Sequence, residues 1–441
     1  MPQMNRRNVL AVSTAALATA TRLAAMGKPV AKTPFAFPPK FLWGAATAGH
    51  QVEGGNVNSD LWAIEHAKPT IFAEPSGDAC DSYNRWAEDL DIVRDLGLNT
   101  YRFSLEWARI EPEPGEFSLG ALDHYRRMIA GCRERGLTPM VTFNHFTAPR
   151  WFAANGGWEG EGAVDRFARY CERSAKALAD QIGYATTLNE PELLRIFKWM
   201  PGLMPPELVK IQTQMLAAAA KASGSDRFGV MIAGDADRLL EPLIAAHRAG
   251  VAAIKGVRPD LPVGVSLAMI DDQAVGPNSL RDKKRAEVYG AWLEVAKADD
   301  FVGVQNYERQ RLDAKGALPP PPGAELSQMG AEVYPASLEG VVRFAHAATG
   351  KPVIVTENGL ATTDDTRRQA YIPQAIAGVA RAMADGVPVL GYVHWSLLDN
   401  YEWIFGYRPR YGLVEVDRVT FKRTPKPSAR VLGDIAKRNA V

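Results

Sequence analysis

A regular alternation of short apolar runs and longer amphipathic segments fills the chain from residue 35 onward. Eight of these runs are rich in β-branched or aromatic residues, which is typical of buried strands. The runs cover residues 41–48, 100–107, 139–146, 185–188, 263–267, 301–306, 353–357 and 389–395. Parallel strands need long crossover connections, and the segments between the runs can supply these as helices. The pattern therefore predicts an α/β fold built on a parallel sheet.

Two of the connecting segments show helical spacing clearly. One predicted helical face carries Tyr83, Trp86, Leu90 and Val93, and another carries Leu122, Tyr125, Ile129 and Cys132. Residues spaced by three and four positions lie on the same side of a helix, so each segment is predicted to be amphipathic.

Two architectures share this alternation, an open doubly wound sheet and a closed (β/α)₈ barrel. Eight strands match the closure of a barrel, and no GxGxxG turn follows the first strand as it would in a nucleotide-binding doubly wound sheet. The predicted fold is therefore a single (β/α)₈ TIM barrel that spans residues 29–441. The proline-rich stretch 319–322 is too short to link two domains, and it predicts a stiff loop.

The first 28 residues differ from the rest of the chain. Paired arginines at positions 6 and 7 precede an Ala/Thr-rich stretch at 11–25, which contains a small-residue site at 18–20. This order is typical of an export signal, and the paired arginines indicate the twin-arginine route. The stretch is too short and too polar to span a bilayer. We expect a periplasmic or secreted protein; a disordered amphipathic tail is the alternative.

Composition excludes several classes of partner. The 51 Lys and Arg residues against 50 Asp and Glu residues give a net charge of +1, which favours neither nucleic acid nor an anionic membrane. The three cysteines, Cys80, Cys132 and Cys171, lack CxxC spacing, which argues against a disulfide scaffold or a cysteine zinc site. The expected partner is a small molecule.

Glutamates end two of the predicted strands. Glu190 follows the strand 185–188, and Glu357 ends the strand 353–357. In a TIM barrel the carboxyl ends of the strands build the active site, so both side chains should face one pocket. Two carboxyl groups across a pocket are what glycosidic cleavage requires, and strands three positions apart allow the retaining separation of about 5–5.5 Å.

Other strand ends supply groups that would tune these carboxyls. A cation at Arg102 and a phenol at Tyr307 would keep Glu357 ionised, whereas drier aromatic surroundings would keep Glu190 protonated. His145 has no second histidine at ligand spacing, so we expect no metal site there.

The remaining strand ends suit a sugar. Trp395 and Trp403 offer flat apolar faces on which a pyranose can lie. Groups that could bond its hydroxyls are Gln51, His145, Asn189 and Glu402. The chain shows no basic cluster or glycine-rich cradle for phosphate, so a neutral polyol is the better fit.

With these motifs in this order, the chain resembles glycoside hydrolase family 1, the β-glucosidase and β-galactosidase family of retaining (β/α)₈ barrel enzymes. The resemblance runs from about residue 37 to residue 428. The matching segments are FLWGAATAGHQVEG at 41–54, GDACD at 77–81, YRFS at 101–104, TLNEP at 187–191, VTENG at 355–359 and WSLLDNYEW at 395–403. The chain departs from the family pattern at His50, at Phe146 and over 192–200.

The resemblance implies a role for each matching residue. Glu190 corresponds to the acid/base and Glu357 to the nucleophile. Three residues are implied to hold the nucleophile: Arg102, Asn306 and Tyr307. Asn189 is implied to bind the sugar 2-hydroxyl. The residues implied to bind the glycone are Gln51, His145, Glu402 and Trp403, with Trp395 as the platform beneath the ring. No metal or organic cofactor is implied.

The predicted function is that of a retaining, exo-acting β-glycosidase, with β-glucosidase as the expected activity. A retaining transglycosylase with the same site is one alternative. A catalytically inactive sugar-binding barrel is another, but it would lack a carboxylate, and both are present here. The sequence leaves open the preferred sugar, the leaving group and the oligomeric state.

Overall fold

The computed structural model describes residues 34–200, 202–203 and 205–441. The predicted export signal, residues 1–28, lies outside these ranges. Residues 36–441 form one compact unit, and the description below concerns this unit.

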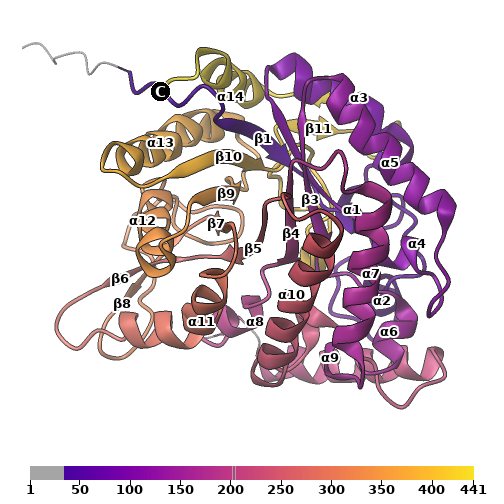
Figure 1. The fold of residues 1–441 in the computed structure, drawn as a ribbon. Helices are drawn as coiled ribbons and strands as arrows, with labels where there is room; N and C mark the ends of the chain where they lie inside the picture. The colour runs from indigo at the N-terminus through magenta and orange to yellow at the C-terminus, as the bar shows by residue number, and fades with distance from the viewer. Residues whose placement is uncertain (1–33, 201, 204) are drawn as a thin grey trace, which may run out of the picture. The chain divides into compact units, whose positions relative to one another are not determined.

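Parallel strands close into a barrel at the centre of the unit (Figure 1). Around the ring the order is β1-β10-β9-β7-β5-β4-β3-β2, so the first and last strands pair with each other. Within the described residues the eight barrel strands are β1 (Leu42–Ala46), β2 (Thr100–Ser104), β3 (Thr138–Asn144), β4 (Tyr184–Asn189), β5 (Val263–Ala268), β7 (Phe301–Asn306), β9 (Val353–Asn358) and β10 (Val389–Trp395). Each overlaps one predicted run. Closure of the ring confirms the barrel and excludes the open doubly wound sheet.

Helices cover the outside of the barrel, with a long one between each pair of successive barrel strands (Figure 1). These are α3 (Ser82–Leu96), α5 (Leu119–Glu134), α7 (Ala163–Leu178), α10 (Ala236–Val257), α11 (Arg281–Ala296), α12 (Ser337–Thr349) and α13 (Asp365–Ala384), with α14 (Pro427–Arg438) after the last strand. The shorter helices and the separate helix α9 are α1 (Gly49–Val52), α2 (Asp60–Glu65), α4 (Trp107–Ile110), α6 (Arg150–Ala154), α8 (Leu193–Phe197) and α9 (Pro206–Ala222).

The two predicted helical faces lie in α3 and α5. The four apolar residues predicted on α5 are all buried. On α3, Leu90 and Val93 are buried, whereas Tyr83 and Trp86 are only half-buried because they pack sideways. The Tyr83 ring stacks on that of His124 in α5 at 3.7 Å between centroids. The amphipathic pattern therefore includes the contact between neighbouring helices as well as the contact with the barrel.

A second apolar cluster supports the loops at the carboxyl end of the barrel. It joins residues of α2, α6 and α9 to Tyr401, and Trp403 packs against it. Tyr401 donates a hydrogen bond from its hydroxyl to the Glu74 carbonyl oxygen at 3.0 Å. This cluster fixes the loop after β10, which carries Glu402 and the short 3₁₀ helix η3 (Trp403–Phe405).

Two small sheets and two short 3₁₀ helices extend the connecting loops. β6 (Asp271–Ala274) pairs with β8 (Arg309–Leu312), and β11 (Val414–Val416) pairs with β12 (Arg423–Pro425). The 3₁₀ helices are η1 (Gly157–Glu159) and η2 (Met231–Ala233). Residues 319–322 lie in the loop after β8 and have no helix or strand assignment, as predicted. None of the helices in the part of the chain described here combines the length and the apolar character needed to cross a membrane.

Candidate active site

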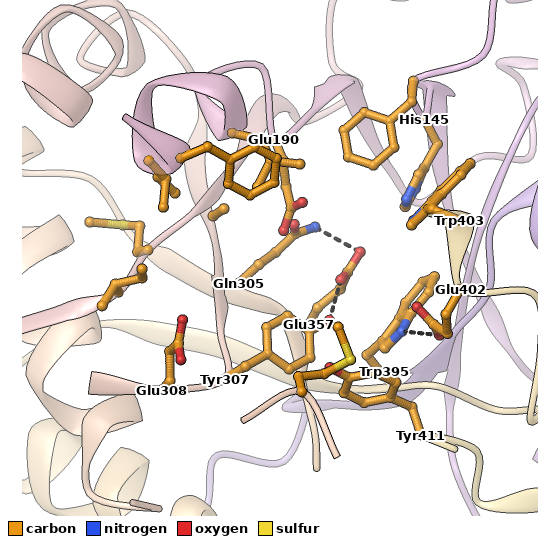
Figure 2. Close-up of a pocket in the computed structure, with 18 of the residues that line it drawn as sticks. His145, Glu190, Gln305, Tyr307, Glu308, Glu357, Trp395, Glu402, Trp403 and Tyr411 are labelled. Carbon is orange, nitrogen blue, oxygen red and sulfur yellow. Dashed lines mark hydrogen bonds between the residues drawn. The ribbon is translucent and has the colours of Figure 1, made fainter. Parts of the chain in front are cut away.

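The carboxyl ends of the barrel strands open onto a cavity of about 240 Å³. Glu190 and Glu357 both line it, and Figure 2 shows their carboxyl groups pointing into the same space. Also in the lining are Gln51, His145, Tyr307, Trp395, Glu402 and Trp403. Most of the predicted site residues therefore meet at one place.

Glu357 is the most heavily bonded side chain in this cavity. Arg102 donates from Nη1 to Glu357 Oε1 at 2.5 Å, and Tyr307 donates from its hydroxyl to Oε2 at 2.5 Å. Arg102 is 0% exposed, so its charge acts on Glu357 with little screening by water. The bonds hold both carboxylate oxygens in place and favour the ionised form.

Gln305 supplies the amide contact to Glu357 that the family resemblance assigned to Asn306. Gln305 donates from Nε2 to Glu357 Oε1 at 2.9 Å. Asn306 faces away from the cavity, where it donates to the carbonyl oxygens of Met269 and Glu308 and accepts a bond from Ser337. The prediction for Asn306 was wrong by one position, because side chains alternate between the two faces of a strand.

This alternation was a usable signal in the sequence. Tyr307 faces the cavity, so a period of two places Gln305 on the same side and Asn306 on the other. A polar Gln305 inside an otherwise apolar strand was the residue to choose, and the sequence reasoning missed it.

Asn189 bonds to the side chains that hold Glu357. Its Oδ1 accepts bonds from Arg102 Nη2 at 2.5 Å and from Gln305 Nε2 at 2.8 Å. The side chain thus ties together the two donors that hold Glu357. The predicted contact of Asn189 with a sugar hydroxyl stays a prediction.

Glu190 stands where β4 ends and the backbone turns sharply. Its φ is +46°, in the left-handed region that side-chain-bearing residues seldom adopt. The turn is fixed because the Glu190 N–H donates to the Ser266 carbonyl oxygen of β5 at 2.8 Å. Strained backbone of this kind clusters at functional sites. Phe146 and Trp403, which also line the cavity, have φ values of +71° and +51°.

The environment separates the acidities of the two glutamates. Burial raises the pKa of Glu190 well above its usual range, and the negative charge of Glu357 raises it further. Burial also raises the pKa of Glu357, but the Arg102 charge and the Tyr307 hydrogen bond oppose that rise. Glu357 therefore loses its proton first, and Glu190 keeps its own. Retaining and inverting glycosidases both use one ionised and one protonated carboxyl group.

Aromatic rings form one end of the cavity. The His145 ring lies nearly parallel to two indole rings, that of Trp395 at 5.7 Å and that of Trp403 at 6.1 Å between centroids. Burial lowers the pKa of His145 well below its usual range, so the ring is neutral at ordinary pH. In the part of the chain that the structure describes, the buried Nδ1 of His145 has no hydrogen-bond partner, so the neutral imidazole can bond a sugar hydroxyl.

Gln51 and Glu402 complete this polar end. Trp395 donates from its indole nitrogen to Glu402 Oε1 at 3.3 Å. Gln51 donates to Asn400 Oδ1 at 3.0 Å and to the Tyr401 carbonyl oxygen at 2.7 Å, while its own Oε1 has no protein partner among the described residues. That buried acceptor is suited to a hydroxyl donor from a ligand.

The two departures from the family pattern at single positions, His50 and Phe146, pack against the same tryptophan. The His50 ring lies parallel to Trp403 at 6.0 Å between centroids, and Phe146 meets it edge-on at 5.2 Å. Phe146 itself lines the cavity, whereas His50 contacts Trp403 without lining it. Within the ranges described, no three His, Cys, Asp or Glu side chains are grouped so that they could hold a metal ion.

A sequence model of the family described as glycosyl hydrolase family 1 matches residues 33–237 and 294–441, which together exceed half of the chain. The chain belongs to glycosyl hydrolase family 1. Its barrel and its two strand-end glutamates fit this assignment, and the family resemblance of the motifs is confirmed.

Relatives of this family-1 chain cover nearly its whole length. It is 30% identical to the beta-glucosidase of Agrobacterium sp. (strain ATCC 21400), over 89% of this chain and 94% of the relative. A solved structure of beta-glycosidase BGL167 is 50% identical, with a TM-score of 0.87 over 92% of this chain and 98% of the other. The apo structure of a beta-glucosidase 1317 is 45% identical, with a TM-score of 0.87 over 90% and 98%. The chain is a glycoside hydrolase.

Proposed function

We propose that this family-1 enzyme is a retaining, exo-acting β-glucosidase. The observation that carries glycoside cleavage is the asymmetry between two carboxyl groups in one cavity, and the retaining outcome is the one that the family resemblance implies. Glu357 is held ionised by Arg102 and Tyr307, whereas Glu190 keeps its proton because burial and the Glu357 charge raise its pKa. The names of the relatives point to the same activity.

The first chemical step uses both groups. A Glu357 oxygen forms a bond to the anomeric carbon while the bond from that carbon to the leaving oxygen breaks. Glu190 gives its proton to the leaving oxygen, which departs as an alcohol. As the ester forms, Glu357 loses its negative charge, so the pKa of Glu190 falls and the group becomes a base.

The second step releases the sugar. Glu190 takes a proton from water, the water oxygen bonds to the anomeric carbon, and the Glu357 carboxylate leaves. Two displacements restore the β configuration. An exo mode of action is supported by the polar end of the cavity, where the lining residues Gln51 and His145 are buried.

We propose further that residues 1–28 direct export by the twin-arginine route. The support is the order of paired arginines, apolar stretch and small-residue site. Expression of the full chain with a C-terminal tag should place it in the periplasm or medium. The variant with Arg6→Lys and Arg7→Lys should stay in the cytoplasm, and an unchanged location would refute this route.

The activity is tested with the signal-less protein on p-nitrophenyl β-glucoside, β-galactoside, β-fucoside, β-mannoside, β-xyloside and α-glucoside. We expect β-selective release with glucose preferred, and loss of turnover in Glu357→Ala. Release from the α-glucoside alone, or full activity in the variant, would contradict the proposal.

Azide separates the roles of the two glutamates. With 2,4-dinitrophenyl β-glucoside, Glu190→Ala should form the glycosyl-enzyme, and azide should then attack opposite Glu357 to give β-glucosyl azide. In Glu357→Ala, azide should replace the nucleophile and give α-glucosyl azide. Nuclear magnetic resonance of the products distinguishes the two anomers, and circular dichroism checks that both variants fold. Exchanged anomers would reverse the assignment.

A further inference from the structure

The cavity has two chemically different sides. Figure 2 shows His145, Trp403, Glu402 and Trp395 on one side, Glu308 on the other, and the two glutamates between them. Under the proposed function, the first side holds the sugar. The second side must then receive the leaving group.

The leaving-group side is lined by apolar side chains. The apolar members of the cavity lining include Leu193, Ile196 and Phe197, which share one face of α8, and three methionines, Met200, Met269 and Met329. Of these, Phe197, Met200 and Met329 also line the outer cleft together with Glu308. Apart from Glu308, this wall presents few groups that could bond the hydroxyls of a second sugar. Methionines adapt to ligands of irregular shape.

The same wall continues outward into a larger cleft of about 700 Å³. Met200, Met329 and Glu308 line both spaces, so the two are continuous. Two large apolar side chains in the cleft, Met329 and Leu203, are each 37% exposed. Exposed apolar surface next to an active site is typical of a ligand-binding groove.

Several polar side chains of the outer cleft already have hydrogen-bond partners within the protein. Arg309 donates to both Glu332 oxygens, at 3.0 and 2.7 Å. Gln310 accepts from the buried Lys284 at 2.6 Å, and Arg311 donates to a backbone carbonyl of the proline-rich loop. These bonds take up part of the hydrogen-bonding capacity of the cleft.

Glu308 is different, because its carboxyl group faces the cavity without a hydrogen-bond partner in the described part of the chain. Lys284 acts on it only through space, since its ammonium group bonds to Asp272 and Gln310. The Glu308 side chain is half-buried, so its carboxyl group can exchange cavity water for a polar group of a bound ligand.

We propose that the leaving-group side takes an extended, largely apolar alcohol or phenol that carries one hydrogen-bond donor, in preference to a second sugar. The apolar wall contacts its hydrocarbon skeleton, and Glu308 accepts the donor. This inference rests on the proposed β-glucosidase function, and it names the class of glucoside that the enzyme cleaves best.

The first test compares n-octyl β-glucoside with cellobiose. Both leaving groups are poorly acidic alcohols that need the Glu190 proton, so their kcat/KM ratio reports on leaving-group binding. We expect octyl glucoside to be favoured by about tenfold or more, because its chain buries apolar area that glucose lacks. If the enzyme cleaves p-nitrophenyl β-glucoside but prefers cellobiose to octyl glucoside, the inference about the leaving group is overturned and the proposed function still stands. No β-glucoside cleavage at all would overturn the proposed function.

Matched variants locate the effect on the cleft. Met329→Gln adds an amide to the lining at nearly constant shape, and should lower the octyl-to-cellobiose ratio about threefold or more. Leu326→Gln makes a similar change at a 44% exposed residue of the same loop that does not line the cleft. It should leave the ratio unchanged. Equal ratios in all three proteins would contradict the proposal.

Glu308 is tested with alkyl β-glucosides of about four to ten carbons, each paired with its ω-hydroxyl form. For at least one chain length, the wild type should prefer the hydroxylated partner. Glu308→Leu should remove that preference, and Glu308→Gln, which keeps an acceptor, should retain part of it. A merely structural role would lower both members of a pair equally and would overturn the assignment of Glu308.

Discussion

At the residue scale, the charge of Glu357 depends on a small set of neighbours. Arg102 and Tyr307 each bond one carboxylate oxygen, and Glu190 and Glu402 are the nearby acids. Arg102 and Tyr307 could not replace each other, because Arg102 supplies a positive charge and Tyr307 supplies a neutral hydrogen-bond donor. The pH dependence of the enzyme should report this division.

Removal of the Tyr307 hydroxyl should shift the acidic side of the pH profile. Its hydrogen bond favours ionised Glu357, so Tyr307→Phe should raise the pKa of Glu357. Activity requires ionised Glu357 and protonated Glu190. The acidic limb of kcat/KM against pH should therefore move up by about one unit, and the alkaline limb, which follows Glu190, should move less.

The profile is measured with p-nitrophenyl β-glucoside from about pH 4 to pH 9. Tyr411→Phe is the matched control, because its ring meets Tyr307 edge-on at 5.6 Å and the substitution also removes a phenol from the cavity lining. A downward shift of the acidic limb in Tyr307→Phe, or equal shifts in both variants, would contradict the role of Tyr307.

At the scale of elements, the positions of the strands were predictable, whereas the side of the strand on which each side chain lies was less so. All eight barrel strands within the described residues overlap predicted runs, since each run is short, apolar and separated from the next by a helical segment. The motif positions Glu190 and Glu357 followed directly from strand ends. The error at Asn306, where Gln305 makes the contact, came from assigning one motif residue without applying the two-residue period to β7.

The leaving-group wall was beyond prediction for a different physical reason. It is built by α8 and by the loop that carries Met329, which meet only in the folded chain. No periodicity within either segment shows that contact. Loops of this kind take their position from tertiary packing, and their side chains are not fixed by strand register.

Gln305 and Asn306 lie on opposite faces of β7, so substitutions at these adjacent residues should have different effects. Gln305→Met removes a donor to Glu357 and Asn189, so kcat/KM should fall about tenfold to a hundredfold. Asn306→Ala removes three bonds that tie β7 to neighbouring loops, so the free energy of unfolding should fall by about 1–3 kcal/mol. Steady-state kinetics and urea denaturation measure the two effects. If Gln305→Met lowered stability and Asn306→Ala lowered kcat/KM instead, the two faces of β7 would be misassigned.

At the scale of the whole described unit, the first and last parts of the barrel are joined by one side chain. Asn439, just after α14, accepts a bond from the Trp43 indole nitrogen at 2.9 Å and donates to the Phe37 carbonyl oxygen at 2.7 Å. Trp43 lies in β1, which pairs with β10 to close the ring. Residues almost 400 positions apart are thereby fixed to each other, in addition to the backbone pairing.

Asn439 also has a φ of +49°, a left-handed conformation that asparagine tolerates better than alanine. The Asn439 side chain also donates to the Pro38 carbonyl oxygen at 3.2 Å, so Asn439→Ala should lose three hydrogen bonds and gain backbone strain. The free energy of unfolding should fall by about 2–3 kcal/mol. Asn439→Gly loses the same bonds without the strain, so its loss should be smaller by about 1 kcal/mol. Urea denaturation followed by tryptophan fluorescence measures both. Because Asn439 is remote from the cavity lining, kcat should stay unchanged for the folded fraction, and a lowered kcat at full folding would show that barrel closure also positions the two glutamates.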